Sequence, residues 1–180
     1  MTLPQRVDQT LEAAGWIPSQ VQAIAVSLGP GSYAGIRTAI AFAQGWQLVH
    51  AVRLVGVPSA DALAAAAQAA GRRGAHHVLI DAQRGEFYRA EYELGEETAV
   101  CLSSLKIVSS AEALAGLAVA RGLSPDAPAL GSACEEAFPT AATIAQLAAR
   151  HLAQPAATDA LADTPLEPVY LRPVQFAKTP

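Results

Sequence analysis

The residues best suited to chemistry lie in the stretch SLGPGSYAGIRTAIAFAQGW, at positions 27–46. A glycine turn that opens a helix can bind an anion, because the first backbone N–H groups of the helix point outward and its dipole favours negative charge. This turn matches neither G-x-G-x-x-G nor GxxxxGK[ST], no lysine follows it, and Pro30 lacks an N–H group. The pattern favours a tight strand-to-helix turn, with phosphate binding as the alternative. The loop residues of interest are Gly29, Pro30, Gly31, Ser32, Gly35 and Arg37.

The four histidines give little support for a bound metal. His50 and His151 are isolated in the sequence, and His76 and His77 are adjacent. Adjacent residues on a strand point to opposite faces, so they are poorly placed to chelate one ion together. We therefore expect no metal site.

Nucleophilic catalysis has no better support. Ser32 lies in the glycine loop, yet no motif places a histidine or an acid to activate it. Cys101 and Cys134 form no C-x-x-C pair and predict two reduced thiols. We predict no catalytic residue in this chain.

A short turn at positions 81–86, DAQRGE, gathers charged side chains. Asp81, Arg84 and Glu86 lie between two expected strands, and Gly85 suits the turn between them. An internal ion pair that stabilises the turn is the simpler interpretation. A binding role for these residues is the alternative.

The helix expected over about 33–49 is apolar on almost every side, so it must be covered on two sides. One side can be its own sheet. Small residues at helical spacing form a second stripe, along which another helix can approach closely: Ala34, Thr38, Ala41 and Gly45. A narrower stripe, Leu3, Val7 and Leu11, runs along the first expected helix, which opens with a T-x-x-Q capping box and ends at Gly15. Whether the domain itself or a partner covers these stripes is left open by the pattern.

The elements that carry these residues form an α/β protein. Strands over 21–28 and 54–57 with the helix between them make one crossover unit with parallel strands. Two parallel strands are not a stable sheet alone, so we expect another chain or a further segment to complete it.

The second half of the sequence predicts a separate lobe. After Pro58 we expect a helix from Ser59 to about 70, strands over 77–81, 86–94 and 99–102, and a helix from a capping box at 109–112 to about 121. A short strand at 129–130 and a last helix from about 140 to 152 follow. The expected parts are a partner-binding first lobe over 1–58, a second α/β lobe over 59–160 and an extended tail over 161–180.

Length and composition narrow the class of protein. The chain has 180 residues, of which 16% are charged, and a formal net charge of −4. This acidic balance argues against binding nucleic acid through general electrostatics. No signal peptide is visible, and no uncharged apolar run reaches the roughly 18 residues of a membrane helix. We expect a cytoplasmic protein that does not contact a membrane.

Four stretches of the chain, in this order, resemble the TsaB family of accessory subunits that act in making threonylcarbamoyladenosine in tRNA. They are LGPGSYAGIRTAIAFAQGW, VGVPSADALA, IDAQRGEFYRA and PVYLRP. The resemblance implies an actin-like and sugar-kinase-like (ASKHA) α/β fold with two lobes. It also implies a non-catalytic subunit without a cofactor. Such a subunit pairs with the paralogue TsaD, alongside the ATPase TsaE, for threonylcarbamoyl transfer to the adenosine next to the anticodon, and meets tRNA only through the complex.

The resemblance also implies where the partner binds. TsaB pairs with TsaD through helices of its first lobe, which matches the two apolar stripes described above. The residues expected at this interface are Val7, Leu11, Ala34, Thr38, Ala41, Phe42 and Gly45. Pairing with a second copy of the chain is left open.

One departure from the family matters. Members usually begin with a strand ending in an acidic residue and a hairpin, whereas this chain opens at the first helix, so we expect an incomplete first lobe. The segment that is absent would carry the first of the two loops that bind phosphate in nucleotide-binding relatives. We therefore expect nucleotide binding less. The alternative function, from another class, is a glycoprotease-like peptidase or a nucleotide-dependent transferase.

Overall fold

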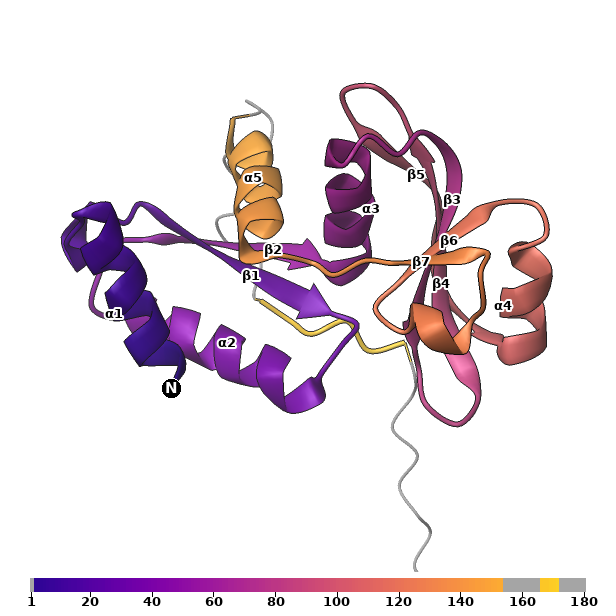
Figure 1. The fold of residues 1–180 in the computed structure, drawn as a ribbon. Helices are drawn as coiled ribbons and strands as arrows, with labels where there is room; N and C mark the ends of the chain where they lie inside the picture. Colours follow the sequence, from indigo (N-terminus) through magenta and orange to yellow (C-terminus); the bar gives the residue numbers. More distant parts are fainter. Residues whose placement is uncertain (1, 154–165, 172–180) are drawn as a thin grey trace, which may run out of the picture. The chain divides into compact units, whose positions relative to one another are not determined.

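The computed structural model describes residues 2–153 and 166–171, and it is an α/β structure of two compact units (Figure 1). The first unit comprises Met1–Ala62 and Pro139–Pro168, and the second comprises Leu63–Phe138 and Val169–Pro180. The two units are described separately below.

The sheet of the first unit has two parallel strands. β1 (Ala23–Gly29) and β2 (Arg53–Pro58) are joined through helix α2 (Tyr33–Gln47), as the crossover pattern predicted. Helix α5 (Ala141–Leu152), whose N-cap Thr140 accepts a hydrogen bond from the backbone N–H of Thr143, packs on the same two strands. Figure 1 shows α2 on one face of this sheet and α5 on the other.

Strand alternation divides the core of the first unit into two layers. Towards α2, the strands contribute Ile24, Val26, Leu28 and Leu54, which pack with Ile36, Ala39, Ile40 and Ala43 of the helix. Towards α5, they contribute Ala25, Val55 and Val57, which pack with Ile144, Leu147, Ala148 and Leu152. Each fully buried aliphatic side chain in these layers contributes roughly 1.5–3 kcal/mol relative to exposure.

Helix α1 (Leu3–Ala14) is bounded as its sequence predicted but is weakly buried. The backbone N–H of Thr2 donates to Oε1 of Gln5 at 2.8 Å, and Gly15 ends the helix in a left-handed conformation, with φ 67°. None of its residues is buried, and Leu3, Val7 and Leu11 are half-buried. A 3-10 turn, η1 (Pro18–Gln20), connects α1 to β1.

The second unit is built on a mixed sheet of five strands in the order β5-β4-β3-β6-β7. β3 (Gly74–Asp81), β4 (Glu86–Leu94) and β5 (Ala99–Ser109) are antiparallel neighbours. β6 (Arg121–Ser124) pairs parallel with β3, and β7 (Cys134–Glu136) pairs parallel with β6. Helix α3 (Ser59–Ala69) enters this unit, and α4 (Ser110–Gly116) follows β5.

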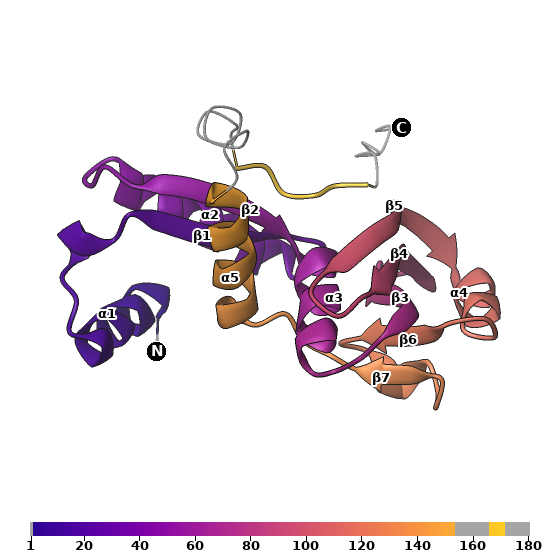
Figure 2. The same ribbon diagram turned by 90° about the horizontal axis from the view of Figure 1, so that it is seen from above.

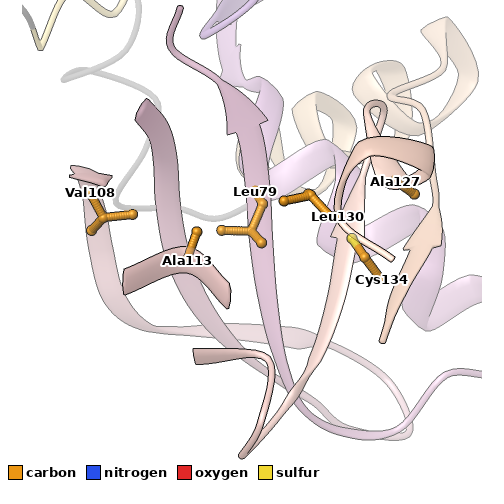
Figure 3. Close-up of a cluster of buried hydrophobic side chains, with 6 residues drawn as sticks. All are labelled: Leu79, Val108, Ala113, Ala127, Leu130 and Cys134. Atoms are coloured by element: carbon orange, nitrogen blue, oxygen red, sulfur yellow. The ribbon is translucent and has the colours of Figure 1, made fainter. Parts of the chain in front are cut away.

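The two faces of the five-stranded sheet are both covered. Leu79 of β3 packs with Ala113 of α4, Val108 of β5 and three residues from 127–134 (Figure 3). Because neighbouring strand residues alternate, Val78 and Ile80 point to the opposite face, beside which Figures 1 and 2 show α3. Nε2 of Gln68 ties α3 to the turn after β4 by donating to the carbonyl of Glu96 at 2.5 Å.

Three expectations for the second lobe were wrong. The helix after Ser109 ends at Gly116 instead of about 121, because residues 121–124 pair with β3 as a strand. The strand expected at 129–130 is a 3-10 turn, η2 (Ala127–Ala129). Strands β6 and β7 were not predicted, and β5 continues to Ser109 instead of ending at Leu102. For the helix after Ser109, long-range pairing of residues 121–124 with β3 overrides the local helix preference of an alanine-rich segment.

The expected division into a first lobe over 1–58, a second lobe over 59–160 and a tail over 161–180 remains a prediction. Of the expected tail, only residues 166–171 lie within the described structure, and Arg172 lies outside it. Within residues 2–153 and 166–171, no helix is long and apolar enough to cross a membrane.

The two cysteines differ in burial, which predicts different reactivity. Cys101 is exposed on β5, whereas Cys134 is buried, and burial raises the pKa of the Cys134 thiol to about 11. Because the thiolate is the reactive form, iodoacetamide at pH 8 should alkylate Cys101 at least about tenfold faster in the folded chain. Peptide mass spectrometry checks this, and both thiols should react alike in urea. Equal rates in the folded chain would contradict the buried position of Cys134.

Candidate functional site

Helix α2 is held against its sheet along one side. Ile40 and Ala43 are buried, and Ile36 and Ala39 are partly buried beside them. At about 100° of rotation per residue, these four positions cover one side of the helix and fix its rotation about its axis. The opposite side of α2 is therefore turned away from the sheet.

The stripe of small residues lies on that opposite side. Ala34, Thr38, Ala41 and Gly45 are all exposed, and they fall within an arc of about 60° centred opposite the buried residues. A Cβ atom added at Gly45 would have nothing within 4 Å. We call these four residues the small-residue stripe. The structure brings them together as the sequence pattern predicted, on a surface that the rest of the described chain leaves open.

Two aromatic residues lie beside the small-residue stripe. Phe42 and Trp46 are both half-buried, and their ring centroids are 5.7 Å apart. Offset or tilted rings at this distance attract each other, which holds Phe42 in place at the edge of the stripe.

The other flank of α2 is occupied by a local pair. The guanidinium of Arg37 donates to the hydroxyl of Tyr33 and lies 5.2 Å from the centre of its ring. Both side chains are exposed, and the pair spans one turn of the helix. Arg37 is thus a surface residue stabilised by its neighbour. The sequence analysis singled it out but did not foresee the tyrosine as its partner.

The glycine loop is built as a tight turn. Gly29 has φ 90°, and a Cβ there would lie 2.7 Å from Cδ1 of Ile36, so both the backbone and the packing require glycine. Oγ of Ser32 accepts from the backbone N–H of Gly35 at 3.3 Å and so caps α2. The serine hydroxyl and one N–H of the loop are therefore used within the loop itself. These contacts support the favoured interpretation of Gly29, Pro30, Gly31, Ser32 and Gly35 as a tight strand-to-helix turn.

The hairpin turn at 81–86 has an unusual backbone. Gln83, Arg84 and Gly85 are consecutive residues with positive φ, at 65°, 59° and 74°. The carboxylate of Asp81 accepts from the backbone N–H and the side-chain amide of Gln83, each at 2.7 Å. Asp81 is thus bound by Gln83 and not by Arg84, and the hydroxyl of Ser110 donates to the carbonyl of Gly85 at 2.6 Å. Arg84 is exposed at the tip, where two non-glycine residues in the left-handed region each cost about 1 kcal/mol.

A buried polar cluster beneath α4 escaped the sequence analysis. His77 and Glu91 are paired across β3 and β4, and Arg89 forms an ion pair with Glu91 at 3.2 Å. Gly116 packs so closely that an added Cβ would lie 2.7 Å from Nδ1 of His77. Burial lowers the pKa of His77, opposed by the nearby Glu91 carboxylate. The only feature of the sequence that could have revealed this cluster was the alternation along β3, which shows that His77 points away from His76.

The described residues do not gather the ligands of a metal. Within residues 2–153 and 166–171, no three His, Cys, Asp or Glu side chains lie close enough to hold an ion. In addition, no hydrogen bond joins Ser32 to an acid or a histidine in that part of the chain. The outer side of α2 is therefore the surface that contains most of the residues predicted from the sequence to bind a partner.

Comparison with known proteins is consistent with this geometry. A family model described as "TsaD: tRNA N6-adenosine threonylcarbamoyltransferase" matches residues 1–163. A tRNA threonylcarbamoyladenosine biosynthesis protein TsaB, from Escherichia coli (strain K12), is 40% identical over 93 residues. The match covers 50% of this chain and 39% of that relative, so this chain aligns with well under half of the relative's length.

Solved structures from Pseudomonas aeruginosa share the fold. A protein described as similar to the peptidase YEAZ has a TM-score of 0.76 at 23% identity, covering 94% of this chain and 82% of its own. A second structure, YeaZ, has a TM-score of 0.76 at 24% identity, covering 94% and 83%. These likenesses and the family model confirm the predicted α/β fold of the actin-like and sugar-kinase-like type.

The buried position of His77 predicts a pH dependence of stability. Its pKa is lowered in the folded chain, so below the ordinary value of 6.5 the unfolded chain binds a proton that the folded chain does not. Stability should therefore be unaffected by this group above pH 6.5 and should fall as the pH drops towards the lowered value. His77→Phe, which keeps a ring but cannot titrate, should lose less stability between pH 7.5 and 5.5 in urea unfolding. Parallel losses in both proteins would show that His77 is not the titrating group.

Proposed function

The chain belongs to the tRNA N6-adenosine threonylcarbamoyltransferase family, on its TsaB side, and we propose that it serves there as a non-catalytic accessory subunit. In this proposal it pairs with a TsaD-like paralogue for threonylcarbamoyl transfer to the adenosine next to the tRNA anticodon. A TsaE-like ATPase is the third component. In this proposal the protein acts in the cytoplasm, and this chain binds no cofactor.

The observation that carries the proposal is the exposure of the small-residue stripe. A helix with one side on its sheet normally presents charged or long polar residues to water on the other side. α2 instead presents Ala34, Thr38, Ala41 and Gly45, with the half-buried Phe42 beside them. An uncharged stripe without bulky side chains is a surface on which a second helix can pack closely.

The chemistry of the stripe defines the partner surface. Small residues allow helix axes to approach to about 8 Å, at the close end of the usual range. The partner should therefore offer a helix with a complementary apolar face and no charge opposite Ala41. Val7 and Leu11 on α1, both half-buried, would extend the contact. A stable interface of this kind needs roughly 800 Å² from each partner, which is more than one helix stripe supplies.

The remaining motif residues have structural roles in this proposal. The glycine loop sets the start of α2, since Gly29 packs on Ile36 and Ser32 caps the helix. In the hairpin, Gly85 enables the turn that Asp81 stabilises, while Arg84 and Glu86 complete its charged tip. The acidic net charge of −4 supports contact with tRNA only through the complex.

A charged side chain in the stripe should abolish pairing. Ala41→Glu places a carboxylate on the exposed side of α2, where it costs the free chain little. In the complex it would be buried without a partner charge, which should weaken binding by more than about a hundredfold. Calorimetric titration of the TsaD-like paralogue from the same organism measures this. The matched control is Gln146→Glu, an equal change of charge at an exposed position of α5, which should bind normally.

The two variants also separate loss of binding from loss of folding. Both should keep the circular dichroism and unfolding temperature of the parent chain, because neither site is buried. Undiminished binding by Ala41→Glu would refute the interface. Equal weakening by both variants would mean that net charge matters and the stripe does not.

A further inference from the structure

Helix α3 borders a pocket in the second unit, where its last two turns face β6 and β7. The pocket has a volume of about 190 Å³, and Figure 2 shows α3 beside these two strands. All of its lining residues belong to Leu63–Phe138, so the pocket lies within one unit. We call it the alanine pocket, because four of the six apolar residues that line it are alanines: Ala66, Ala67, Ala70, Leu123, Ala137 and Phe138.

The volume of the alanine pocket matches one aromatic ring. Close-packed proteins leave few voids larger than a water molecule, and a cavity of about 150 Å³ is large enough for benzene. Sites that enclose a whole small-molecule ligand usually have about 300–1,000 Å³. A pocket of 190 Å³ therefore accepts a single ring and leaves the rest of the bound molecule outside.

The apolar wall is suited to an aromatic guest. Ala66 and Ala70 are one helical turn apart on α3, and their methyl groups leave space that a longer side chain would fill. Leu123 is 1% exposed and belongs to the core of the unit, whereas Phe138 is 55% exposed. A ring in the pocket would cover part of Phe138, and tilted or offset rings at such a contact attract each other.

An ion pair links the two sides of the alanine pocket. Nε of Arg72, just after α3, donates to Oε2 of Glu135 on β7 at 2.5 Å, and both residues line the pocket. Nη1 of Arg121 lies 3.2 Å from the other oxygen of Glu135, outside the pocket lining. The hydrogen bond from Arg72, together with the charges of both arginines, lowers the pKa of Glu135. The end of α3 and β7 are thus linked in the free chain.

Glu136 supplies the remaining charge at the rim of the pocket. Its side chain is exposed and takes part in no ion pair or hydrogen bond within residues 2–153 and 166–171. Of the three charged residues that line the pocket, Arg72 and Glu135 neutralise each other. Glu136 therefore leaves one negative charge beside the apolar wall, which favours a ligand with a positive charge next to its ring.

We propose that the alanine pocket binds a phenylalanine side chain of a partner polypeptide that has a lysine or arginine next to it in sequence. The ring fills the pocket against α3 and Phe138, and the neighbouring cation lies beside Glu136. An aromatic side chain that fills a pocket with a polar rim is a common anchor of protein interfaces. This site goes beyond the proposed pairing through α2, because it lies in the second unit and uses none of the residues of the small-residue stripe.

The test uses short peptides that carry one ring. The probe is a capped tetrapeptide of glycine, 4-fluorophenylalanine, lysine and glycine, whose fluorine NMR signal reports binding to the full chain. We expect saturable one-to-one binding. An unlabelled peptide with alanine in place of the phenylalanine should not compete. A peptide with glutamate in place of lysine should bind about threefold more weakly, the size expected of an exposed ion pair.

Variants at the end of α3 locate the binding site. Ala70→Leu extends a branched side chain from the pocket wall and should weaken peptide binding by at least about tenfold. Ala69→Leu is the matched control, because Ala69 is also exposed but does not line the pocket, and this variant should bind as the parent does. Both variants should keep the unfolding temperature of the parent, since neither alanine is buried. Glu136→Gln should keep peptide binding but lose the preference for lysine over glutamate.

Each other outcome contradicts the proposal. No saturable binding, or equal binding by Ala70→Leu and Ala69→Leu, would show that the alanine pocket does not bind the ring. If toluene binds as tightly as the peptide and displaces it, the pocket takes a free small molecule and not a side chain of a partner. If the chain alone forms a dimer by light scattering that Ala70→Leu dissociates, the occupant is a second copy. None of these results depends on whether the chain binds a TsaD-like protein.

Discussion

The first unit depends on the packing of one helix against two strands. Ile36, Ile40 and Ala43 of α2 lock into the layer formed by Ile24, Val26 and Leu28, and this contact fixes the rotation of the helix. Gly29 lets the chain turn so closely that Ile36 lies where a side chain would be. Once this contact forms, the small-residue stripe must face outward.

Elements with strong local signals were predictable from the sequence. α1 has a capping box and a terminal glycine, α2 follows a glycine turn, and the alternation in 86–94 gave β4 its exact bounds. β6 and β7 were not predictable, because each has few residues and exists through pairing with β3 or with each other. Gly122 illustrates the difference: it allows close packing against Cys134, a neighbour twelve residues away that no local pattern reveals.

The candidate site shows the same difference between residues placed by local sequence patterns and residues placed by long-range contacts. Helical periodicity alone placed Ala34, Thr38, Ala41 and Gly45 on one side of α2, and the structure has them there, exposed. The cluster of His77, Glu91 and Arg89 was hidden, because His77 and Glu91 pair across two strands and Arg89 joins them through its ion pair with Glu91. The turn at 81–86 was expected to depend on charge pairs, yet Asp81 accepts from the uncharged Gln83. The family resemblance supplied the function, which neither periodicity nor geometry states on its own.

The most direct test of the account is to observe the alanine methyl groups of α2 while the partner binds. NMR spectra of the chain labelled at its alanine methyls, titrated with the TsaD-like paralogue, distinguish Ala34 and Ala41 on the stripe from the buried Ala43. We predict large changes at Ala34 and Ala41, with Ala141 and Ala142 at the exposed start of α5 unchanged. If binding leaves the stripe methyls unchanged, or perturbs α5 instead, the outer side of α2 is not the partner surface.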